Sequence, residues 1–421
     1  MNVVIINKSD FNGGAAVVSY RLMNALRRRG VNASMLVADK ITDSPHVRLA
    51  ASRLRINAEF IADRLPVFFA NRFNYGNVFK ADSASAGLPL HRHPLVLGAD
   101  VICLNWINQG VLSLRGIGQL LRLGKPIVWT MHDMWCFTGI CHHAGACRRW
   151  TAHCGDCPLL GKGASARDLS YRTLQKKLSV YDLSSRLHFV AVSNWLADRT
   201  RNSTLLRNIP VTVIPNAFPI EELHTPIRGK NADNDPSVPF RIVFGAARLD
   251  DSIKGLPILV EATGILKTNY PEESSKIELV TFGSLKNPRA LDDIAISHKH
   301  LGIISGEESI REIYRNADAV ISTSLYETLP GTLVEGQVYG CIPVAFDRGG
   351  QSDIIDHLHT GYLAEWNDDK ERAARNIADG ILWAMKQDRE KICGRMLESA
   401  RNRFDAPVVA GKYLDLFESL L

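Results

Sequence analysis

Two cations stand on one predicted loop in the second half of the chain, in a spacing that suits an anionic ligand. Arg248 and Lys254 follow a short β-branched run that we expect to be a strand. Arginine offers a planar fork of donors and lysine a compact charge, so the pair could clamp a diphosphate. The alternative is a pair of solvated surface charges. The position directly after a strand favours the ligand site, because parallel sheets bind ligands beyond the carboxyl ends of their strands.

Two carboxylates lie further along, on either side of a Pro-Gly turn. We expect Glu327 on a loop and Glu335 about one turn inside the helix that this turn opens. A loop carboxylate can accept hydrogen bonds from sugar hydroxyls, and the amides at a helix start can face an anion. Spacing alone leaves a competing interpretation, in which an acidic residue near the helix N-terminus only complements the helix dipole.

A glycine pair lies between the first predicted strand and the first predicted helix. Gly13 and Gly14 would let the backbone approach a ligand at a helix N-terminus, which favours an anion such as a phosphate. The alternative is a tight strand–helix turn. The pattern is not G-x-G-x-x-G, which argues against a dinucleotide site.

Four cysteines fall within 17 residues: Cys141, Cys147, Cys154 and Cys157. In a reducing compartment such a cluster favours a structural zinc site over disulfides. The last two cysteines form a knuckle-like C-x-x-C turn, whereas the first two are more widely spaced than usual. The alternatives are free thiols in a packed insertion, or two disulfides in an oxidising compartment.

Composition sets the class of protein. The chain has 421 residues, 46% of them hydrophobic and 22% charged, with a net charge of +6. These values indicate a globular enzyme of two or three domains and exclude disordered and fibrous proteins. The basic residues are dispersed, so we expect no nucleic-acid partner. We see neither a targeting segment nor a membrane-spanning run and expect a cytoplasmic protein.

Short β-branched runs alternate with helix-length segments along the chain, a pattern that predicts parallel sheets with right-handed crossovers. We expect helices at 15–29, 256–267 and 310–316. The expected strands are residues 3–6, 33–37, 101–104, 127–131, 189–193, 211–214, 241–244, 277–282, 319–322 and 342–345.

The polar, Pro- and Gly-bearing segment 223–239 is expected to be a linker between two domains. We predict an α/β protein with Rossmann-like domains at 1–215 and 216–400. The two doubly wound sheets would face each other across a cleft. A Cys-rich insertion is expected at about 136–160 in the first domain. Residues 401–421 should form a helix that packs back on that domain.

These motifs together resemble the retaining glycosyltransferases of family 4, which have the GT-B fold. The resemblance covers most of the chain and is similar to a subgroup that builds bacterial capsule, exopolysaccharide or lipopolysaccharide sugars. Besides the charged residues above, it rests on Gly13-Gly14, Asn105-Trp106 and His132-Asp133-Met134-Trp135 in the first half, and on Ile214-Pro215-Asn216, Gly340-Cys341-Ile342-Pro343-Val344 and Gly349-Gly350 in the second.

The resemblance implies a role for each residue. Arg248 and Lys254 would hold the diphosphate of a UDP- or GDP-sugar and stabilise its developing charge without a catalytic divalent metal. Glu335 would bind the ribose and Glu327 the donor sugar. Further donor contacts would come from the backbone amides of Gly331, Thr332 and Leu333, from Gly13 and Gly14, and from His132 near the incoming hydroxyl. The sequence Leu329-Pro330-Gly331 replaces the family's usual aromatic-Gly pair, which puts the turn geometry in question.

The implied reaction is transfer of a sugar, with retention, to a glycan or a lipid-linked oligosaccharide, the leaving phosphate taking the acceptor proton. One alternative is a nucleotide-sugar epimerase or a sugar-phosphate synthase of the same fold. An alternative of another class is a non-catalytic sugar- or zinc-binding module.

A basic, apolar segment raises the question of membrane contact. Its helical periodicity most often marks a helix that faces a core, and Pro66 predicts two short helices there. The other interpretation is an amphipathic surface at the inner face of the membrane. The apolar positions are Leu54, Ala58, Ile61, Leu65, Phe68 and Phe69, with Arg53, Arg55, Arg64 and Arg72 around them.

Overall fold

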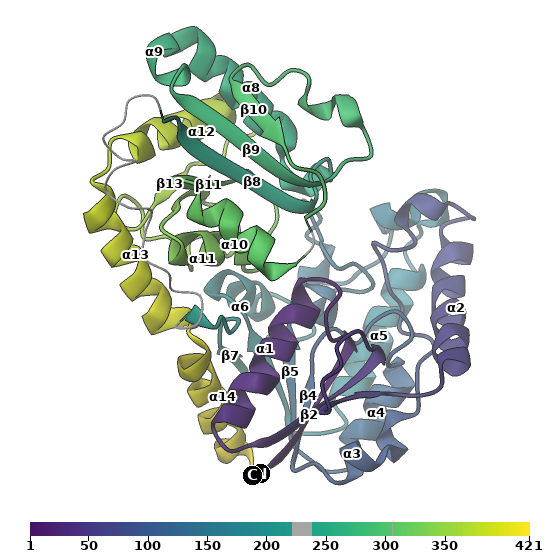
Figure 1. Cartoon of the computed structure of the whole chain (residues 1–421). Coiled ribbons are helices and arrows are strands. Elements are labelled where there is room, and N and C mark those ends of the chain that lie inside the picture. The colour runs from purple at the N-terminus through teal and green to yellow at the C-terminus, as the bar shows by residue number, and fades with distance from the viewer. Residues whose placement is uncertain (221–237, 305) are drawn as a thin grey trace. The chain divides into compact units, whose positions relative to one another are not determined.

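A computed structural model describes residues 1–220, 238–304 and 306–421 (Figure 1). The chain divides into two compact units: unit 1 comprises Met1–Ala217 with Ala406–Leu421, and unit 2 comprises Phe218–Asp405. The predicted domain limits were 215/216 and 400/401. All but the last two residues of the predicted linker 223–239 lie outside the described residues.

Unit 1 is built on a seven-stranded parallel sheet in the order β3-β2-β1-β4-β5-β6-β7. The central strands are buried along their whole length, because helices cover both faces of a sheet of this kind. The strands are β1 (Asn2–Ser9), β2 (Asn32–Asp39), β3 (Val47–Leu49), β4 (Val101–Leu104), β5 (Ile127–Met131), β6 (Leu187–Ala191) and β7 (Val211–Val213).

The last helix of the chain, α14 (Ala406–Leu420), belongs to unit 1 and lies against α1 (Gly14–Arg28). Its apolar face joins the core under β1, and the Tyr413 hydroxyl hydrogen-bonds to Thr130 Oγ1 of β5 at 2.8 Å. The other helices of unit 1 are α2 (Arg53–Ala70), α3 (Pro94–Leu97), α4 (Leu114–Leu121), α5 (Leu169–Tyr181) and α6 (Asn194–Arg201).

Unit 2 has a six-stranded parallel sheet in the order β10-β9-β8-β11-β12-β13. Its strands are β8 (Phe240–Arg248), β9 (Ile277–Ser284), β10 (Ser297–His300), β11 (Ala319–Ser322), β12 (Ile342–Phe346) and β13 (Tyr362–Ala364). The helices among its described residues are α8 (Leu256–Asn269), α9 (Pro271–Ser274), α10 (Glu307–Arg315), α11 (Gly331–Val338), α12 (Lys370–Met385) and α13 (Arg389–Phe404). The prediction of two doubly wound parallel sheets is therefore confirmed.

The segment around Pro66 differs from its prediction. Residues 53–70 form the single helix α2 with Pro66 inside it, so the prediction of two short helices was wrong. Pro66 lies four residues before the helix end at Ala70, and it removes the amide that would donate to the Ala62 carbonyl oxygen. The expectation of a core-facing apolar stripe was also wrong, because Leu54, Ile61, Leu65 and Phe69 are exposed.

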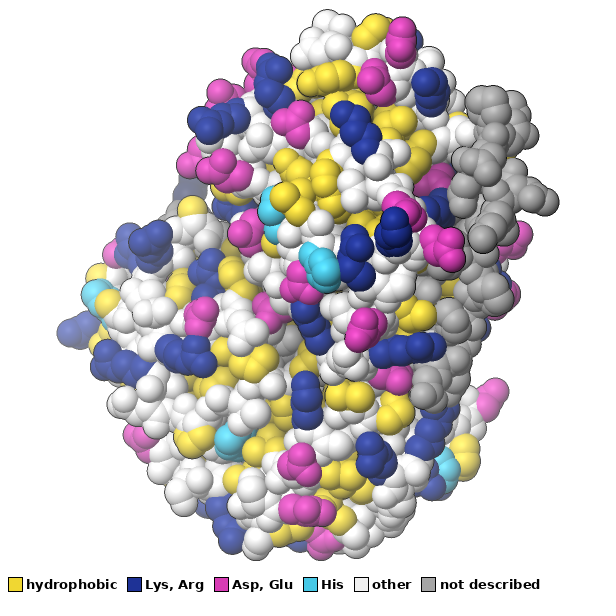
Figure 2. All heavy atoms as spheres, turned by 90° about the vertical axis from the view of Figure 1, so that its left-hand side faces the viewer, with side chains coloured by type: hydrophobic (Ala, Val, Ile, Leu, Met, Phe, Trp, Pro, Cys, Tyr) yellow, Lys and Arg dark blue, Asp and Glu magenta, His cyan; other side chains and the backbone are white. Residues whose placement is uncertain are grey.

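Among the described residues, we find no helix with the length and apolar character needed to cross a membrane. On the face of the molecule drawn in Figure 2, Lys and Arg side chains are interspersed with Asp and Glu, and no single-sign stripe is seen there.

Candidate functional site

The loop after β8 and the loop after β11 are joined by hydrogen bonds. The Thr323 hydroxyl donates to the Lys254 carbonyl oxygen at 3.0 Å, and the Leu325 amide donates to the Ile253 carbonyl oxygen at 2.7 Å. The sheet order reverses between these two strands, since β8 is the first strand of unit 2 and its neighbours are β9 and β11. Ligands of open α/β sheets bind at such a switch point.

Gly255 fixes the course of the first loop. Its φ is +70°, and a Cβ atom there would lie 2.1 Å from the Thr323 carbonyl oxygen. Any other residue would clash with the neighbouring loop and adopt a strained backbone. The close approach places Lys254 at the edge of the sheet, beside the residues that follow β11.

Lys254 and Glu327, predicted in separate motifs, form an ion pair. The Nζ–Oε1 distance is 2.5 Å, and the side chains are 26% and 20% exposed. The Gly350 amide donates to the Glu327 carbonyl oxygen at 3.0 Å, so the loop after β12 holds the Glu327 backbone. Three loops thus bring a cation and a carboxylate together where solvent reaches both.

Arg248 ends β8 and remains partly exposed. Its Nη2 lies 2.9 Å from Asp251 Oδ2, and its Nε lies 3.5 Å from Asp250 Oδ1. Asp250 is itself fixed by the backbone amides of Lys286 and Asn287, which donate to it at 2.9 Å and lower the pKa of its carboxyl. The two acidic neighbours orient the guanidinium while leaving part of it accessible.

Helix α11 begins at Gly331 after Pro330, and no side-chain oxygen caps it. Glu335 lies one turn inside the helix, as the spacing predicted, and its side chain is half-buried. Thr332 is half-buried in the first turn, whereas the Leu333 side chain is buried and its amide donates to the Pro330 carbonyl oxygen at 3.2 Å.

In unit 1, His132 follows β5. Its Nε2–H donates to Asn105 Oδ1 at 2.8 Å, at the end of the neighbouring strand β4. Burial lowers the pKa of His132 to about 4, so the imidazole is neutral near pH 7 and its Nε2 is a hydrogen-bond donor.

The glycine pair also lies at the carboxyl edge of the unit 1 sheet, where α1 begins. Gly13 has a φ of +93° and Gly14 is the first helical residue. A Cβ atom on either would meet no other atom within 4 Å. Packing inside unit 1 therefore does not demand glycine at position 14, and the open space leaves room for a ligand.

A polar cluster that the sequence analysis missed lies beside His132. Asp133 accepts hydrogen bonds from Trp106 Nε1 at 2.9 Å, from His142 Nδ1 at 2.7 Å and from the Trp135 amide at 2.8 Å. The His142 imidazole holds the pKa of the Asp133 carboxyl well below its usual range. A buried acid directly after an apolar strand was the available signal, because such a charge needs partners.

The four predicted cysteine ligands line one cavity of about 20 Å³ in the segment between β5 and α5. None of them forms a disulfide. Within the described part of the chain, no three or more His, Cys, Asp and Glu side chains are arranged to hold a metal ion as they stand.

Comparisons with known proteins agree with this architecture. Residues 12–222 match the family described as Glycosyltransferase Family 4, and residues 231–403 match that described as Glycosyl transferases group 1. Over 211 residues the chain is 23% identical to the putative colanic acid biosynthesis glycosyl transferase WcaC of Escherichia coli K12, a match that covers 47% of this chain and 50% of WcaC. The chain thus matches about half the length of that curated relative.

Two solved structures show the same fold. Anabaena Alr3699/HepE, crystallised with UDP, has a TM-score of 0.61 at 15% identity over the whole of both chains. Sucrose-phosphate synthase from Thermosynechococcus elongatus has a TM-score of 0.64 at 16% identity, over 100% of this chain and 99% of that one. With its two doubly wound parallel sheets and a family match over half its length, this chain belongs to glycosyltransferase family 4 and has the GT-B fold.

Proposed function

We propose that the protein transfers a sugar from a nucleotide-sugar donor to an acceptor hydroxyl with retention of configuration. The observation that carries the proposal is the meeting of Lys254 with Glu327 at the switch point of unit 2, with Arg248 ending the neighbouring strand. Two cations in a partly exposed loop suit a diphosphate, and a carboxylate beside them suits sugar hydroxyls.

In this proposal each residue has a defined task. Arg248 and Lys254 bind the diphosphate, and they stabilise it further as the bond to the sugar breaks and negative charge grows on the leaving oxygen. Glu335 accepts hydrogen bonds from the ribose hydroxyls and Glu327 from the donor sugar. The first-turn amides of α11, at Gly331, Thr332 and Leu333, support sugar and phosphate. The assignment of Gly13, Gly14 and His132 to the same donor rests on the family resemblance and stays a prediction.

The proposed reaction needs no nucleophile from the protein. The bond from the sugar's anomeric carbon to the diphosphate oxygen breaks, and a bond from that carbon to the acceptor oxygen forms on the same face. The acceptor proton passes to the leaving diphosphate oxygen. Two fixed cations then carry the charge that a divalent metal carries in other enzymes, so the proposal needs no metal at the diphosphate.

The donor we propose is a UDP-sugar. HepE, which shares the fold, was crystallised with UDP and with UDP-glucose. A thermal-shift series with UDP, GDP and ADP tests the proposal on the wild type and on Arg248→Ala and Glu335→Ala. At about 100 times its Kd, a ligand stabilises the folded state by about 2.7 kcal/mol. We expect a shift with UDP that both variants lose, whereas no shift with any nucleotide would contradict the proposal.

We propose a bacterial surface glycan, or its lipid-linked precursor, as the acceptor, on the strength of the likeness to WcaC. A product search by mass spectrometry separates this function from the alternatives. Sugar extended on a glycan supports transfer, while free monosaccharide or a sugar phosphate would indicate an epimerase or a synthase. Binding without turnover would indicate a non-catalytic module.

We also propose that the four cysteines bind one structural zinc ion. Cys141, Cys147, Cys154 and Cys157 surround the same small cavity, whose volume suits a single ion or water. Burial raises the pKa of the Cys154 and Cys157 thiols, and hydrogen bonds from the Gly139 and Leu159 amides to the two sulfurs oppose part of that rise. Coordination requires the four side chains to turn toward the centre of the cavity.

Metal analysis of protein purified without chelator tests the zinc proposal. We expect about one zinc per chain in the wild type, little in Cys154→Ser/Cys157→Ser, and an unchanged content in Cys136→Ala. Cys136 is a matched control, because it lies in the same segment but does not line the cavity. A zinc-free wild type, with free thiols or two disulfides by intact mass, would contradict the proposal.

A further inference from the structure

Helix α2 and the residues after it expose an unusual amount of apolar side chain. We define the α2 surface as the seven large hydrophobic residues that are exposed there: Leu54 (85%), Ile61 (58%), Leu65 (42%), Phe69 (57%), Phe73 (61%), Tyr75 (77%) and Phe79 (60%). Single exposed hydrophobic residues are normal on globular proteins, but seven of them on one helix and the nine residues after it indicate an interaction site.

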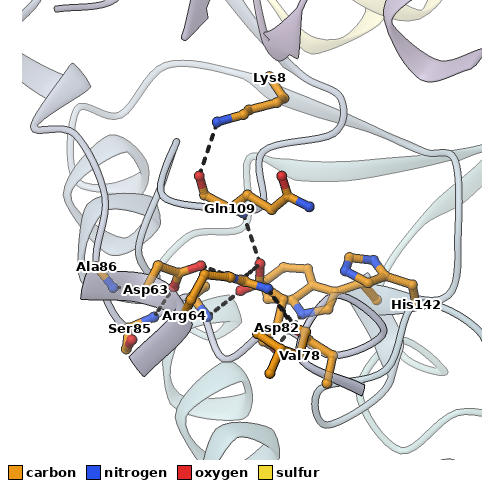
Figure 3. Close-up of polar contacts among 12 residues, drawn as sticks. Lys8, Asp63, Arg64, Val78, Asp82, Ser85, Ala86, Gln109 and His142 are labelled. Atoms are coloured by element: carbon orange, nitrogen blue, oxygen red, sulfur yellow. Dashed lines mark hydrogen bonds and ion pairs between the residues drawn. The ribbon is translucent and has the colours of Figure 1, made fainter. Parts of the chain in front are cut away.

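The opposite face of α2 points into unit 1 and carries a charged pair, Asp63 and Arg64, beside the buried apolar Ile56 and Val67. Arg64 donates hydrogen bonds to the carbonyl oxygens of Val78 and Ala81 at 3.0 Å and forms ion pairs with Asp63 and Asp82 (Figure 3). Asp63 and Asp82 are fully buried, and Arg64 is 6% exposed. The buried face of α2 thus combines this charged pair with apolar contacts, while Leu54, Ile61 and Leu65 stay exposed on the outward face.

Three of the exposed aromatic residues, Phe69, Phe73 and Tyr75, are linked by ring contacts, in part through the half-buried Phe68. The ring centroids of Phe69 and Phe73 are 5.6 Å apart, those of Phe68 and Phe73 are 5.2 Å apart, and those of Phe68 and Tyr75 are 4.8 Å apart. Such spacings are typical of packed aromatic pairs. The side chains after the helix therefore form one apolar surface with those of its last turn.

Basic side chains flank the α2 surface. Arg53 and Arg55 are exposed in the first turn of the helix, and Arg72 and Lys80 are exposed after it. The acidic residue on the helix outside its buried face is Glu59, which lies 3.7 Å from Arg55. Four cations and one acid leave this part of unit 1 with a positive charge.

We infer that the α2 surface binds an anionic lipid bilayer. Aromatic and aliphatic side chains enter the interfacial layer of a bilayer, and arginine and lysine at their edge attract acidic headgroups. A second copy of the chain fits less well, because a two-fold contact through this surface would bring the same cations against one another. The inference concerns attachment and does not depend on the proposed transfer activity.

Vesicle flotation of the full chain tests the inference. One set of vesicles contains phosphatidylcholine alone. The other set contains about one third phosphatidylglycerol, which gives the vesicle surface a negative charge. We expect the wild type to float with the anionic vesicles at low salt and to be released at high salt, because the attraction is partly electrostatic.

Two sets of variants locate the binding surface. Leu54→Ser/Ile61→Ser/Phe69→Ser should stay with the soluble fraction, and Arg53→Gln/Arg55→Gln should bind anionic vesicles at least about tenfold more weakly. The matched control Leu97→Ser/Ile303→Ser removes apolar side chains that are 51% and 73% exposed elsewhere and should bind like the wild type.

A wild type that stays soluble with both vesicles would overturn the inference. So would a triple serine variant that floats unchanged, or light scattering that shows a wild-type dimer which this variant lacks. The UDP thermal shift is measured on every variant. Because α2 lies in unit 1 and the proposed nucleotide loops lie in unit 2, an unchanged UDP shift shows that the loops of unit 2 are intact, whereas an unchanged circular dichroism spectrum and Tm show that unit 1 has folded. Failure of the membrane inference then remains distinct from failure of the proposed function.

Discussion

Replacing Lys254 by alanine separates a structural from a catalytic role for its ion pair with Glu327. The two side chains are 26% and 20% exposed, and their charged atoms are 2.5 Å apart. A pair that solvent reaches contributes about 0–1 kcal/mol to folding. In a unit of this size, a loss of about 1 kcal/mol lowers Tm by about 2–4 °C. A purely structural pair would therefore show a small loss of stability and nothing else.

The proposed role predicts a much larger effect on the reaction. A cation that faces the leaving diphosphate acts where negative charge grows, and removal of one such group typically costs about 2.7–4 kcal/mol of transition-state stabilisation. That cost corresponds to a loss of about 100- to 1,000-fold in kcat. The catalytic effect of Lys254→Ala thus exceeds its effect on stability by about 2 kcal/mol or more.

The assay measures UDP release from UDP-glucose, beside thermal unfolding of the same preparations. Lys267→Ala is the matched control, because Lys267 is an exposed lysine in the last turn of α8, in the same unit. We expect the control to retain wild-type rate and Tm. If Lys254→Ala kept its rate within about twofold of wild type, Lys254 would not act on the leaving group and the reasoning would be refuted.

Three other predictions concern stability. Gly255→Ala places a Cβ atom 2.1 Å from the Thr323 carbonyl oxygen at a φ of +70°. We therefore expect the free energy of unfolding in urea to fall by about 1–3 kcal/mol. An unchanged midpoint of urea unfolding would refute the close approach. Burial lowers the pKa of His132 from 6.5 to about 4, so the unfolded chain binds this proton first as pH falls. The contribution of the neutral His132 to stability is therefore full above pH 6.5 and is lost as pH falls toward 4. The variant His132→Gln should lose less stability than the wild type between these two pH values. If the free energy of unfolding of both proteins fell equally with pH, the shift would be refuted. Tyr413→Phe removes the hydroxyl that lies 2.8 Å from Thr130 Oγ1, and it should lower the free energy of unfolding by about 1–2 kcal/mol. An unchanged Tm would show that this hydrogen bond does not stabilise the protein.

The central strands could be predicted because a strand that is buried on both faces needs an uninterrupted run of apolar residues. The run 127–131 coincides with β5, and 319–322 coincides with β11. The strand β10, Ser-His-Lys-His, could not be found in this way, because all four of its residues are exposed at the sheet edge. Its pairing with β9 depends on long-range contacts that no local pattern records.

The sequence predicts which loop or helix carries each residue of the candidate site. It does not predict which side chains from different loops contact one another. The positions of Arg248 at a strand end and of Glu335 inside a helix follow from the nearby apolar runs and the Pro-Gly turn. The ion pair of Lys254 with Glu327 joins residues 73 positions apart and needs the sheet order. Likewise, periodicity shows that a helix has an apolar face but not which face is buried, which is why the orientation of α2 was wrong.

A crystal structure with a bound UDP-sugar tests the central claim most directly. The account predicts that the diphosphate oxygens accept hydrogen bonds from Arg248 and Lys254, that the ribose hydroxyls donate to Glu335, and that the donor sugar contacts Glu327. Lys254 would then share its Nζ between the carboxylate and the phosphate. A nucleotide bound away from the loops after β8 and β11, or one whose diphosphate touches neither cation, would contradict the account.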